Sequence, residues 1–488
     1  MSATTIEPQQ ARPPRQQRTD GTPSPRRWLV LAVLAAVAFM AQLDLFIVNI
    51  ALPSMQHSFR DAPLNDLSWI LNAYAITFAA LLVPMGRLAD QFGRKRFLLS
   101  GVGVFAAGSV ISAASPTLAI MVLGRVVQAI GGAMIIPTSL GLLYPSFPEH
   151  EHAKVVGIWA GVAAIAASSG PTLGGLLVKA DWRMIFIINV PIALGTIFAG
   201  VKILPEVRAH RRAPLPDPLS GVVLVAALTL LTLATVESST WGWGDPRTLV
   251  MLAVAAGAAA TTVWRTLTHP NALIEATLFE SRQFTTGVVA LFLFFLGFAA
   301  WLLMNVLLFQ DQWHWGVIQT GLALAPGPLA SAALAVNSGR IIGRFGRVLP
   351  AVIGPLMFTA GSAYWLLVAS ATPAYWASFL PGLLIAGAGA GLTQAPLFAA
   401  ASTLPADRAT TGSAVLNMSR QVGSAIGVAM VVTLLASAPG FAGYRHVLEL
   451  MVLTSAAASA TSAISALRAR RARRASHTVQ LAGAVARS

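Results

Sequence analysis

The chain of 488 residues is 56% hydrophobic and 10% charged, whereas a soluble globular protein has roughly 25% charged residues, so most of its surface must face lipid. It contains no cysteine, which excludes disulfides, thiolate metal sites and cysteine nucleophiles. In a soluble protein, the formal net charge of +15 would indicate binding to nucleic acid. A membrane protein, however, carries an excess of Lys and Arg in its cytoplasmic loops. We therefore expect no nucleic-acid partner.

A membrane-spanning helix needs about 20 apolar residues, and the chain offers about fourteen such runs after a Pro-, Gln- and Arg-rich start. The first run is too long for the apolar core of a signal peptide, so we interpret it as the first span. The predicted spans lie near residues 28–52, 68–86, 97–115, 117–144, 155–178, 184–204, 219–236, 247–266, 284–308, 318–337, 348–369, 375–398, 410–435 and 446–466.

Two stretches of the chain are repeated at a constant offset. Gly86–Arg96 reads GRLADQFGRKR, and a degraded copy, GRIIGRFGR, stands 253 residues later at Gly339–Arg347. At the same offset, the stretch GPTLG at Gly170–Gly174 corresponds to GSAIG at Gly423–Gly427. The repeat pairs the first six spans with the last six and leaves the seventh and eighth as an inserted pair.

The distribution of basic residues predicts the orientation. An even number of spans places both termini on one side, and that side holds twenty-six of the 33 Lys and Arg, against five on the other. Both termini are therefore expected in the cytoplasm of a multi-pass protein of the cell membrane. The predicted parts are a disordered basic tail (1–27), a six-helix bundle (28–204), a linker with two inserted helices (205–283), a second six-helix bundle (284–466) and a basic tail (467–488).

The hinge, Gly86–Arg96, combines glycines with a basic cluster. We expect a loop in which Gly86 and Gly93 permit tight turning and Arg94 with its basic neighbours stays in the cytoplasm. Asp90 is the one acid of the hinge. It could pair with Arg94 or lie at the positive N-terminus of another helix, and an ordinary solvated salt bridge is the plainer alternative.

Three charged residues lie deep in predicted spans: Asp44, Arg125 and Arg420. An ionisable group in a span is costly and indicates function. At 1.5 Å per residue, Asp44 and Arg125 both lie roughly 12 Å below the outer boundary, so they could pair or share a water-filled cavity. A proton carrier and a static ion pair both remain open. Arg420 has no acid nearby in the sequence, and backbone carbonyls, Gln421 or an anionic group of a substrate could satisfy it.

One face of the ninth span carries polar and aromatic side chains. Its members recur at i, i+4, i+7 and i+11: Phe294, Phe298, Trp301 and Asn305. They either line a cavity, where aromatic faces could hold flat, lipophilic or cationic compounds, or they face lipid.

The hinge resembles the signature loop of the major facilitator superfamily, between its second and third helices. Six further stretches resemble motifs of the fourteen-helix drug/proton antiporter branch: LDLFIVNIALP (Leu43–Pro53), WILNAY (Trp69–Tyr74), RVVQAIGGA (Arg125–Ala133), SSGPTLGG (Ser168–Gly175), DWRMIFIINVPI (Asp181–Ile192) and RQVGSAIG (Arg420–Gly427). The resemblance implies the major facilitator fold and a proton-coupled antiporter that exports drugs, antibiotics or similar lipophilic small molecules by alternating access.

The resemblance also implies roles for residues. It links Arg125, and with it Asp44, to proton coupling, and it places the partner of Asp90 near Thr410–Gly412. The expected conformational gate comprises Gly86, Asp90, Gly93, Arg94, Gly170, Pro171, Gly174 and Gly175. The expected substrate cavity comprises Asn49, Gln128, Phe294, Phe298, Trp301, Asn305, Arg420 and Gln421.

We expect no enzyme activity, no metal and no cofactor, since the proton gradient would supply the energy, and we expect a monomer with protons, a small-molecule substrate and membrane lipids as partners. The chain has no GxxxxGK[ST] motif for ATP. The resemblance implies that exporters of dications carry extra deep acids in the second half; this chain has none there, so we expect neutral, monovalent or zwitterionic substrates. Two alternatives remain, a flippase that holds a lipid or lipid-precursor headgroup with Arg420, and a non-transporting receptor or sensor with Asp44 and Arg125 in structural roles.

Overall fold

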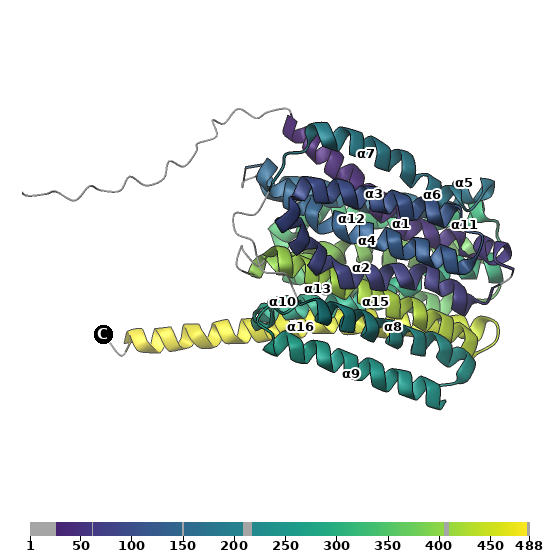
Figure 1. Cartoon of the computed structure of the whole chain (residues 1–488). Helices are drawn as coiled ribbons and strands as arrows, with labels where there is room; N and C mark the ends of the chain where they lie inside the picture. Colours follow the sequence, from purple (N-terminus) through teal and green to yellow (C-terminus); the bar gives the residue numbers. More distant parts are fainter. Residues whose placement is uncertain (1–25, 61, 149–150, 208–216, 405–408, 486–488) are drawn as a thin grey trace, which may run out of the picture.

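The computed structural model describes residues 26–60, 62–148, 151–207, 217–404 and 409–485, and every regular element in these ranges is helical. Thirteen of the described helical stretches are long and apolar enough to cross a membrane. They lie side by side in one bundle (Figure 1), which confirms the predicted all-α membrane class. Most of the tail predicted to be disordered lies outside the described residues.

The first half of the chain supplies six of the predicted spans. Its elements are α1 (Arg26–Ser58), α2 (Leu64–Phe92), α3 (Arg94–Ala113), α4 (Leu118–Leu143), η1 (Tyr144–Ser146), α5 (His152–Ala180), α6 (Met184–Ile187) and α7 (Asn189–Ile203). The 29-residue α5 occupies the place of the fifth predicted span and packs along α1. The sixth span is formed by α6 and α7 together, with a turn at Ile188 between them.

The inserted pair is an antiparallel hairpin of α8 (Pro218–Trp241) and α9 (Pro246–Thr268). Asp217 caps α8 by accepting hydrogen bonds from the backbone N–H groups of Leu219 and Ser220. Arg265 Nε of α9 donates to Asp217 Oδ2 at 2.6 Å, and this guanidinium holds the pKa of the Asp217 carboxyl well below its usual range. The ion pair thus joins the two inserted helices at one end.

The second half repeats the first with more interruptions. Its elements are η3 (Ala276–Glu280), α10 (Arg282–Leu307), the π-helical turn η4 (Leu308–Gln312), α11 (Val317–Leu324), α12 (Pro326–Phe345), α13 (Val348–Val368), the π-helical turn η5 (Tyr375–Phe379), α14 (Leu380–Phe398), η6 (Ala399–Thr403), α15 (Ala409–Ser437) and α16 (Phe441–Val485). The tenth predicted span is formed by α11 and α12 with Ala325 between them.

The two halves share one packing scheme. Helix α1 lies along α5 in the first half, and α10 lies along α15 in the second. A Cβ added at Gly174 would overlap a side chain of α1, and one added at Gly427 would overlap the backbone of α10. The echoed stretches Gly170–Gly174 and Gly423–Gly427 therefore mark the same close helix contact in both halves.

The hinge Gly86–Arg96 is a corner between two helices, so the prediction of a loop was wrong. Helix α2 ends one residue before Gly93 and α3 begins one residue after it. Gly93 has a φ of 98°, and its repeat partner Gly346 has a φ of 75°, a region that a side chain disfavours. Gly86 lies inside α2 and forms no turn. The repeated motif thus preserves one backbone conformation at equivalent corners.

The halves meet along two seams. Helix α2 lies against α15, with α8 packed beside both, and α5 lies against α11 and α12. The second seam is tight, because a Cβ added at Gly175 would lie 3.0 Å from the carbonyl oxygen of Val317. Between the seams, α1 and α10 touch through Phe46 and Phe298, whose ring centroids are 6.3 Å apart.

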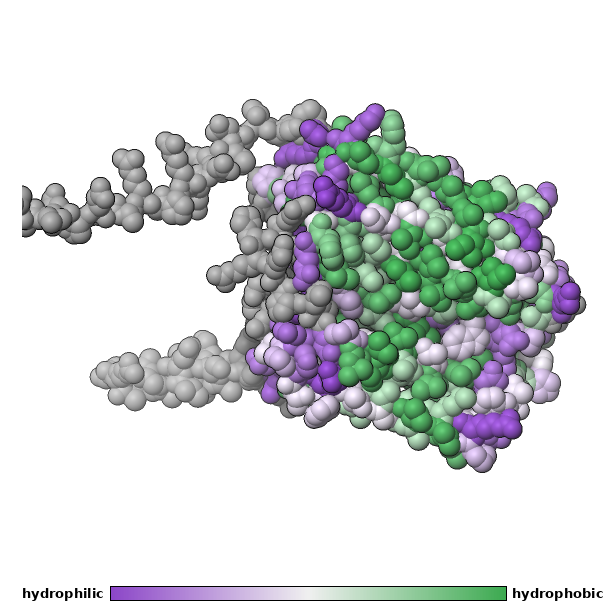
Figure 2. All heavy atoms as spheres, in the orientation of Figure 1, coloured by the Kyte–Doolittle hydropathy of each residue, from purple (hydrophilic) through white to green (hydrophobic). Residues whose placement is uncertain are grey.

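The start of α1 and the far end of α16 lie at the same end of the bundle (Figure 1). We call this end the terminal face and the other the opposite face. Figure 2 shows an apolar belt between hydrophilic rims at the two ends. Helix α16 has 45 residues, so it continues well past the last predicted span, and most of the predicted basic tail (467–488) extends that helix away from the terminal face.

Replacing Gly93 with alanine tests the corner. Because the φ of Gly93 is 98°, Gly93→Ala is expected to lower the free energy of unfolding by about 1–3 kcal/mol and to lower the thermal unfolding midpoint of the purified protein. The matched control is Gly343→Ala in α12, where an added Cβ meets no atom within 4 Å. It should leave the midpoint unchanged or raise it. Equal midpoints for the two variants would contradict this role for Gly93.

Candidate functional site

Asp44 lies on α1 with its side chain fully buried. Its carboxylate accepts three hydrogen bonds: Arg125 Nη1 donates to Oδ2 at 2.5 Å, and Gln128 Nε2 and Asn189 Nδ2 each donate to Oδ1 at 3.0 Å. The predicted common depth of Asp44 and Arg125 therefore corresponds to a direct ion pair. A carboxylate with this many donors is well suited to hold its charge away from water.

Four helices, α1, α3, α4 and α7, contribute to the hydrogen-bond network around Asp44. Arg125 and Gln128 are three residues apart on α4, so both side chains project from one face, and Arg125 Nη1 also donates to Gln128 Oε1 at 2.8 Å. Ser109 of α3 accepts from Gln128 at 2.8 Å and from Asn189 of α7 at 3.3 Å. We refer to these five residues, Asp44, Ser109, Arg125, Gln128 and Asn189, as the Asp44 network.

Helix α2 supplies two further contacts to Arg125. Arg125 Nε donates to the carbonyl oxygen of Ile70 at 3.0 Å, and the guanidinium carbon lies 4.4 Å from the ring centroid of Tyr74, a cation–π contact. Within the described residues, Arg125 Nη2 and Asn189 Oδ1 have no hydrogen-bond partner. The network therefore has one donor and one acceptor to spare for a rearrangement.

The sequence identified part of this network. It placed Asp44 and Arg125 at one depth and left open whether they pair. It assigned Gln128 to the substrate cavity, and the structure shows Gln128 donating a hydrogen bond to Asp44. It missed Ser109 and Asn189. Asn189 could have been found from the sequence, because it is a polar residue within the apolar run of the motif Asp181–Ile192. In the structure, it begins α7, just after the break that separates α6 from α7.

The Asp44 carboxyl is the acid of this network. A proton on it would remove the negative charge that faces the Arg125 guanidinium. Breaking a buried ion pair on one side leaves the other charge uncompensated, so protonation would favour a rearrangement of α1 against α4. The geometry alone is equally that of a static pair.

The predicted gate residues fall at two places. On α5, Gly170 and Gly174 face α1, and Gly175 faces α11. Helix α5 continues through Pro171 without a break. These glycines thus allow close packing against one helix within the half and against a second helix across the seam.

The remaining gate residues lie at the terminal face. The Arg94 side chain donates to the carbonyl of Gly141 at the end of α4, and Arg347 Nη1 likewise donates to that of Ala399 at 2.8 Å. Gly86 of α2 faces Pro137 of α4. The side chain of Asp90 lies outside the described part of the structure, so the prediction that it meets Thr410–Gly412 stays open.

Among the described residues, an ion pair connects the first half to the segment just before the second half at the terminal face. Arg87 Nη2 of α2 lies 3.1 Å from Glu275 Oε1, and Glu275 belongs to the segment between α9 and α10. The sequence did not identify this pair, because the two residues are 188 positions apart.

The aromatic face of α10 is buried, so the interpretation that it faces lipid was wrong. All four of its members are at most 7% exposed: Phe294, Phe298, Trp301 and Asn305. The rings of Phe294, Phe298 and Trp301 stack along the helix. The rings of Phe294 and Trp301 also meet the ring of Phe358 of α13 edge-on. This face therefore forms a continuous aromatic wall that reaches α1 at Phe46.

The other predicted cavity residues are buried on two helices. Asn49 of α1 donates to carbonyls of its own helix, at 3.2 Å to that of Leu45. Arg420 and Gln421 of α15 are buried. The Arg420 guanidinium carbon lies 5.5 Å from the ring centroid of Phe295 and 5.9 Å from that of Phe398, so it adjoins the aromatic wall.

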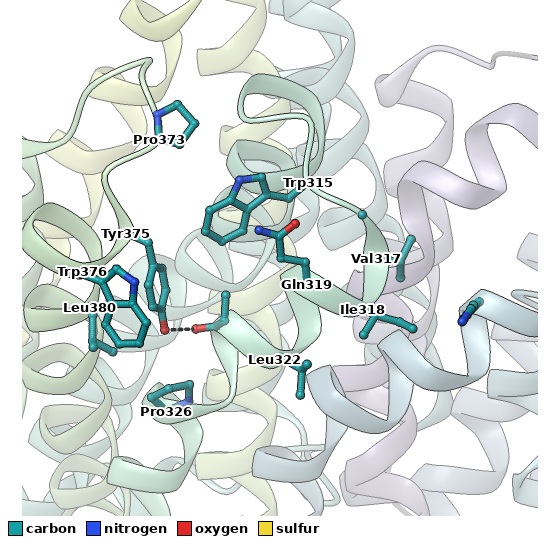
Figure 3. Close-up of a pocket in the computed structure, with 13 residues that line it drawn as sticks. Trp315, Val317, Ile318, Gln319, Leu322, Pro326, Pro373, Tyr375, Trp376 and Leu380 are labelled. Atoms are coloured by element: carbon teal, nitrogen blue, oxygen red, sulfur yellow. Dashed lines mark hydrogen bonds between the residues drawn. The ribbon is translucent and has the colours of Figure 1, made fainter.

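A separate apolar pocket of about 1070 Å³ lies near the opposite face. Figure 3 shows Trp315, Gln319 and Leu322 on one side and Tyr375 and Trp376 on the other, where the Tyr375 hydroxyl donates to the carbonyl of Ala323 at 2.8 Å. Lys179 at the end of α5 is the one charged lining residue. The pocket thus adjoins the seam between α5 and α11. Among the described residues, no group of His, Cys, Asp and Glu is arranged to hold a metal ion.

Comparisons with known proteins give one consistent result. A family model described as Major Facilitator Superfamily matches residues 34–428. The chain is 32% identical over 412 residues to the "Multidrug resistance protein Stp" of Mycobacterium tuberculosis, covering 84% of this chain and 76% of that protein. It is 34% identical over 422 residues to the "Tetracenomycin C resistance and export protein" of Streptomyces glaucescens, covering 85% of this chain and 77% of that protein. The solved structure of the xylose transporter XylE from E. coli, partially occluded and open inward, matches with a TM-score of 0.62 at 13% identity, covering 88% of this chain and 97% of that one.

The ion pair predicts an unequal effect of two substitutions. Arg125→Gln leaves the Asp44 carboxylate buried without its cation, and it is expected to reduce the free energy of unfolding by about 3–5 kcal/mol. Adding Asp44→Asn to that variant removes the uncompensated charge, so the double variant should be more stable than Arg125→Gln alone. Unfolding of the purified variants by denaturant measures both values. Additive losses would show that the two side chains do not interact.

Proposed function

The chain belongs to the major facilitator superfamily, and on that premise we propose that it is a proton-coupled antiporter that exports drugs, antibiotics or similar lipophilic small molecules by alternating access. It is a multi-pass protein of the bacterial cell membrane, in a family of transporters and not of enzymes. The observation that carries the proposal is the Asp44–Arg125 ion pair, which is fully buried among apolar helices.

The proposed orientation places the terminal face in the cytoplasm. The corners at Gly93 and Gly346 both lie on this face with their basic residues, and Arg94 and Lys95 anchor their side chains on backbone carbonyls there. The excess of Lys and Arg on this side supports the assignment. The pocket near Trp315 then lies toward the outside.

The proton step follows from the Asp44 network. A proton that enters from outside neutralises Asp44, and Arg125 Nη1 then loses its ionic partner. Arg125 keeps its hydrogen bonds from Nη1 to Gln128 and from Nε to the carbonyl oxygen of Ile70. The contact between α1 and α4 weakens. Because α1 is packed against α5, and α5 against α11 across the seam, a shift of α1 is passed to the second half.

The gate works through the two seams. Rocking of one half on the other would open α2 from α15 at one step and α5 from α11 at another. The Arg87–Glu275 ion pair supports closure toward the cytoplasm, and the close contact of Gly175 with α11 supports closure toward the outside. The proton gradient supplies the energy, without a cofactor, in a chain that we expect to act as a monomer.

The aromatic wall and Arg420 are the proposed substrate-binding surface. The wall offers stacked rings that suit a flat, lipophilic molecule. The apolar pocket near Trp315 supports the same cargo chemistry, because a lipophilic molecule released there stays in contact with apolar side chains. A flippase for a lipid or lipid precursor is the second candidate, and the same pocket favours it. Loss of one lipid species on deletion, without a change in drug sensitivity, would select the flippase.

Asp44→Asn tests the antiporter. Everted vesicles that contain the wild-type chain are expected to take up a toxic compound found by a sensitivity panel in an efflux-deficient host, and to release protons as they do so. Because Asn cannot take up a proton, Asp44→Asn should abolish gradient-driven uptake and proton release, while exchange of labelled compound across vesicles without a gradient persists.

The matched control is Asp66→Asn, the same change at an exposed acid, and it should retain both activities. Full proton-coupled uptake by Asp44→Asn would refute the role of this carboxylate and leave the static ion pair. If expression of the chain changes the sensitivity of the host to no compound of the panel, and no compound causes proton release from vesicles, the exporter is refuted. That result would favour a receptor or sensor.

A further inference from the structure

Arg420 is a buried cation that the protein does not neutralise. Its side chain is 6% exposed, and its Nε has no hydrogen-bond partner within the described residues. No described carboxylate interacts with it, and its electrostatic partner among titratable groups is Tyr74 across the seam. A charge in this position is costly unless a counter-charge reaches it.

The comparison with Arg125 shows what a satisfied guanidinium looks like in the same protein. Arg125 has a carboxylate, an amide oxygen and a backbone carbonyl as acceptors. Arg420 has instead two aromatic rings, those of Phe295 and Phe398. Cation–π contacts stabilise a guanidinium but leave its N–H donors unused. The site around Arg420 is thus arranged for an acceptor that the described protein does not supply.

Two further polar atoms on the same wall lack partners. Trp301 Nε1, a donor, and Asn305 Oδ1, an acceptor, are buried with no hydrogen-bond partner within the described residues. The rings of Phe295, Phe298 and Trp301 join them to Arg420, with successive centroid distances of 5.4 Å. Buried polar groups are nearly always paired in folded proteins, so three such atoms along one wall indicate a ligand with matching groups.

The helix fixes the spacing of these groups. Phe295, beside Arg420, and Trp301 are six residues apart on α10, which is roughly 9 Å at 1.5 Å per residue. Asn305 follows one turn further. A ligand would therefore present an acid at one end, an aromatic body against the rings, and a group at the other end that can accept from Trp301 or donate to Asn305.

We propose that Arg420 binds an acidic group of the transported molecule and that the substrates are planar aromatic acids with a polar group, such as a hydroxyl, at the far end. This inference rests on the proposed export function and names its substrate class. It also selects the anionic substrate group from the three partners that the sequence left open for Arg420.

Three naphthalene probes test the proposal by equilibrium binding to the full chain in lipid nanodiscs: 6-hydroxy-2-naphthoic acid, its methyl ester and 2-naphthoic acid. The wild-type chain should bind the hydroxy acid about tenfold or more tightly than the ester, because the ester lacks the charge that pairs with Arg420. It should bind 2-naphthoic acid more weakly than the hydroxy acid, because that probe lacks the distal hydroxyl.

Arg420→Gln should remove the preference for the acid over the ester, and Arg420→Lys should restore part of it. The matched control Arg445→Gln, at an exposed arginine, should keep the full preference. The thermal unfolding midpoint of Arg420→Gln should not fall, because the change removes an uncompensated buried charge. A marked fall would instead indicate a structural role and would overturn the proposal.

Equal binding of acid and ester by the wild-type chain, an intact preference in Arg420→Gln, or no binding of the acid would each overturn the proposal. Failure of the export function gives a different pattern. Binding of the acid through Arg420 with no transport in vesicles would refute the antiporter alone, and export of neutral or cationic drugs without binding of the acid would refute this inference alone.

Discussion

A carboxylate held inside a hydrocarbon layer is the constraint on which the first half of this protein depends. Asp44 cannot remain ionised there without a cation and further donors. Four helices besides its own meet that requirement, with α4 supplying Arg125 and Gln128, α3 and α7 supplying Ser109 and Asn189, and α2 supplying a carbonyl and an aromatic ring to the guanidinium. The arrangement of these helices is therefore also the arrangement of the proposed proton site.

The second half uses the same scaffold for another purpose. Glycines bring α15 as close to α10 as α5 is to α1, and a glycine with positive φ forms each corner at the terminal face. The chemistry then diverges. The repeat offset of 253 residues places Gly297 at the position of Asp44. The buried charge of the second half is Arg420, with no carboxylate beside it in the described chain. In the proposed mechanism, the first half would hold the proton and the second half the transported molecule.

Much of the fold was predictable from the sequence, because length, hydropathy and the repeat act along the chain. The spans, the inserted pair and the shared depth of Asp44 and Arg125 follow from such one-dimensional signals. The hinge was misread because glycine and basic residues suggest a loop, while the helices on both sides continue to within one residue of Gly93. Ser109 and Asn189 were missed because their contact depends on how each helix is rotated about its axis. Periodicity placed Phe294 and Trp301 on one face but could not say whether that face meets lipid or protein.

The complete burial of Asp44 has a consequence for the resting cell. In this conformation no part of the carboxylate is open to water, and its acceptor positions are held by side chains of the network. Because described side chains enclose the carboxylate on all sides, a proton reaches it from either face only when the surrounding helices separate. On the proposed function, this closed state would keep the ion gradient of the cell intact while no cargo is being moved.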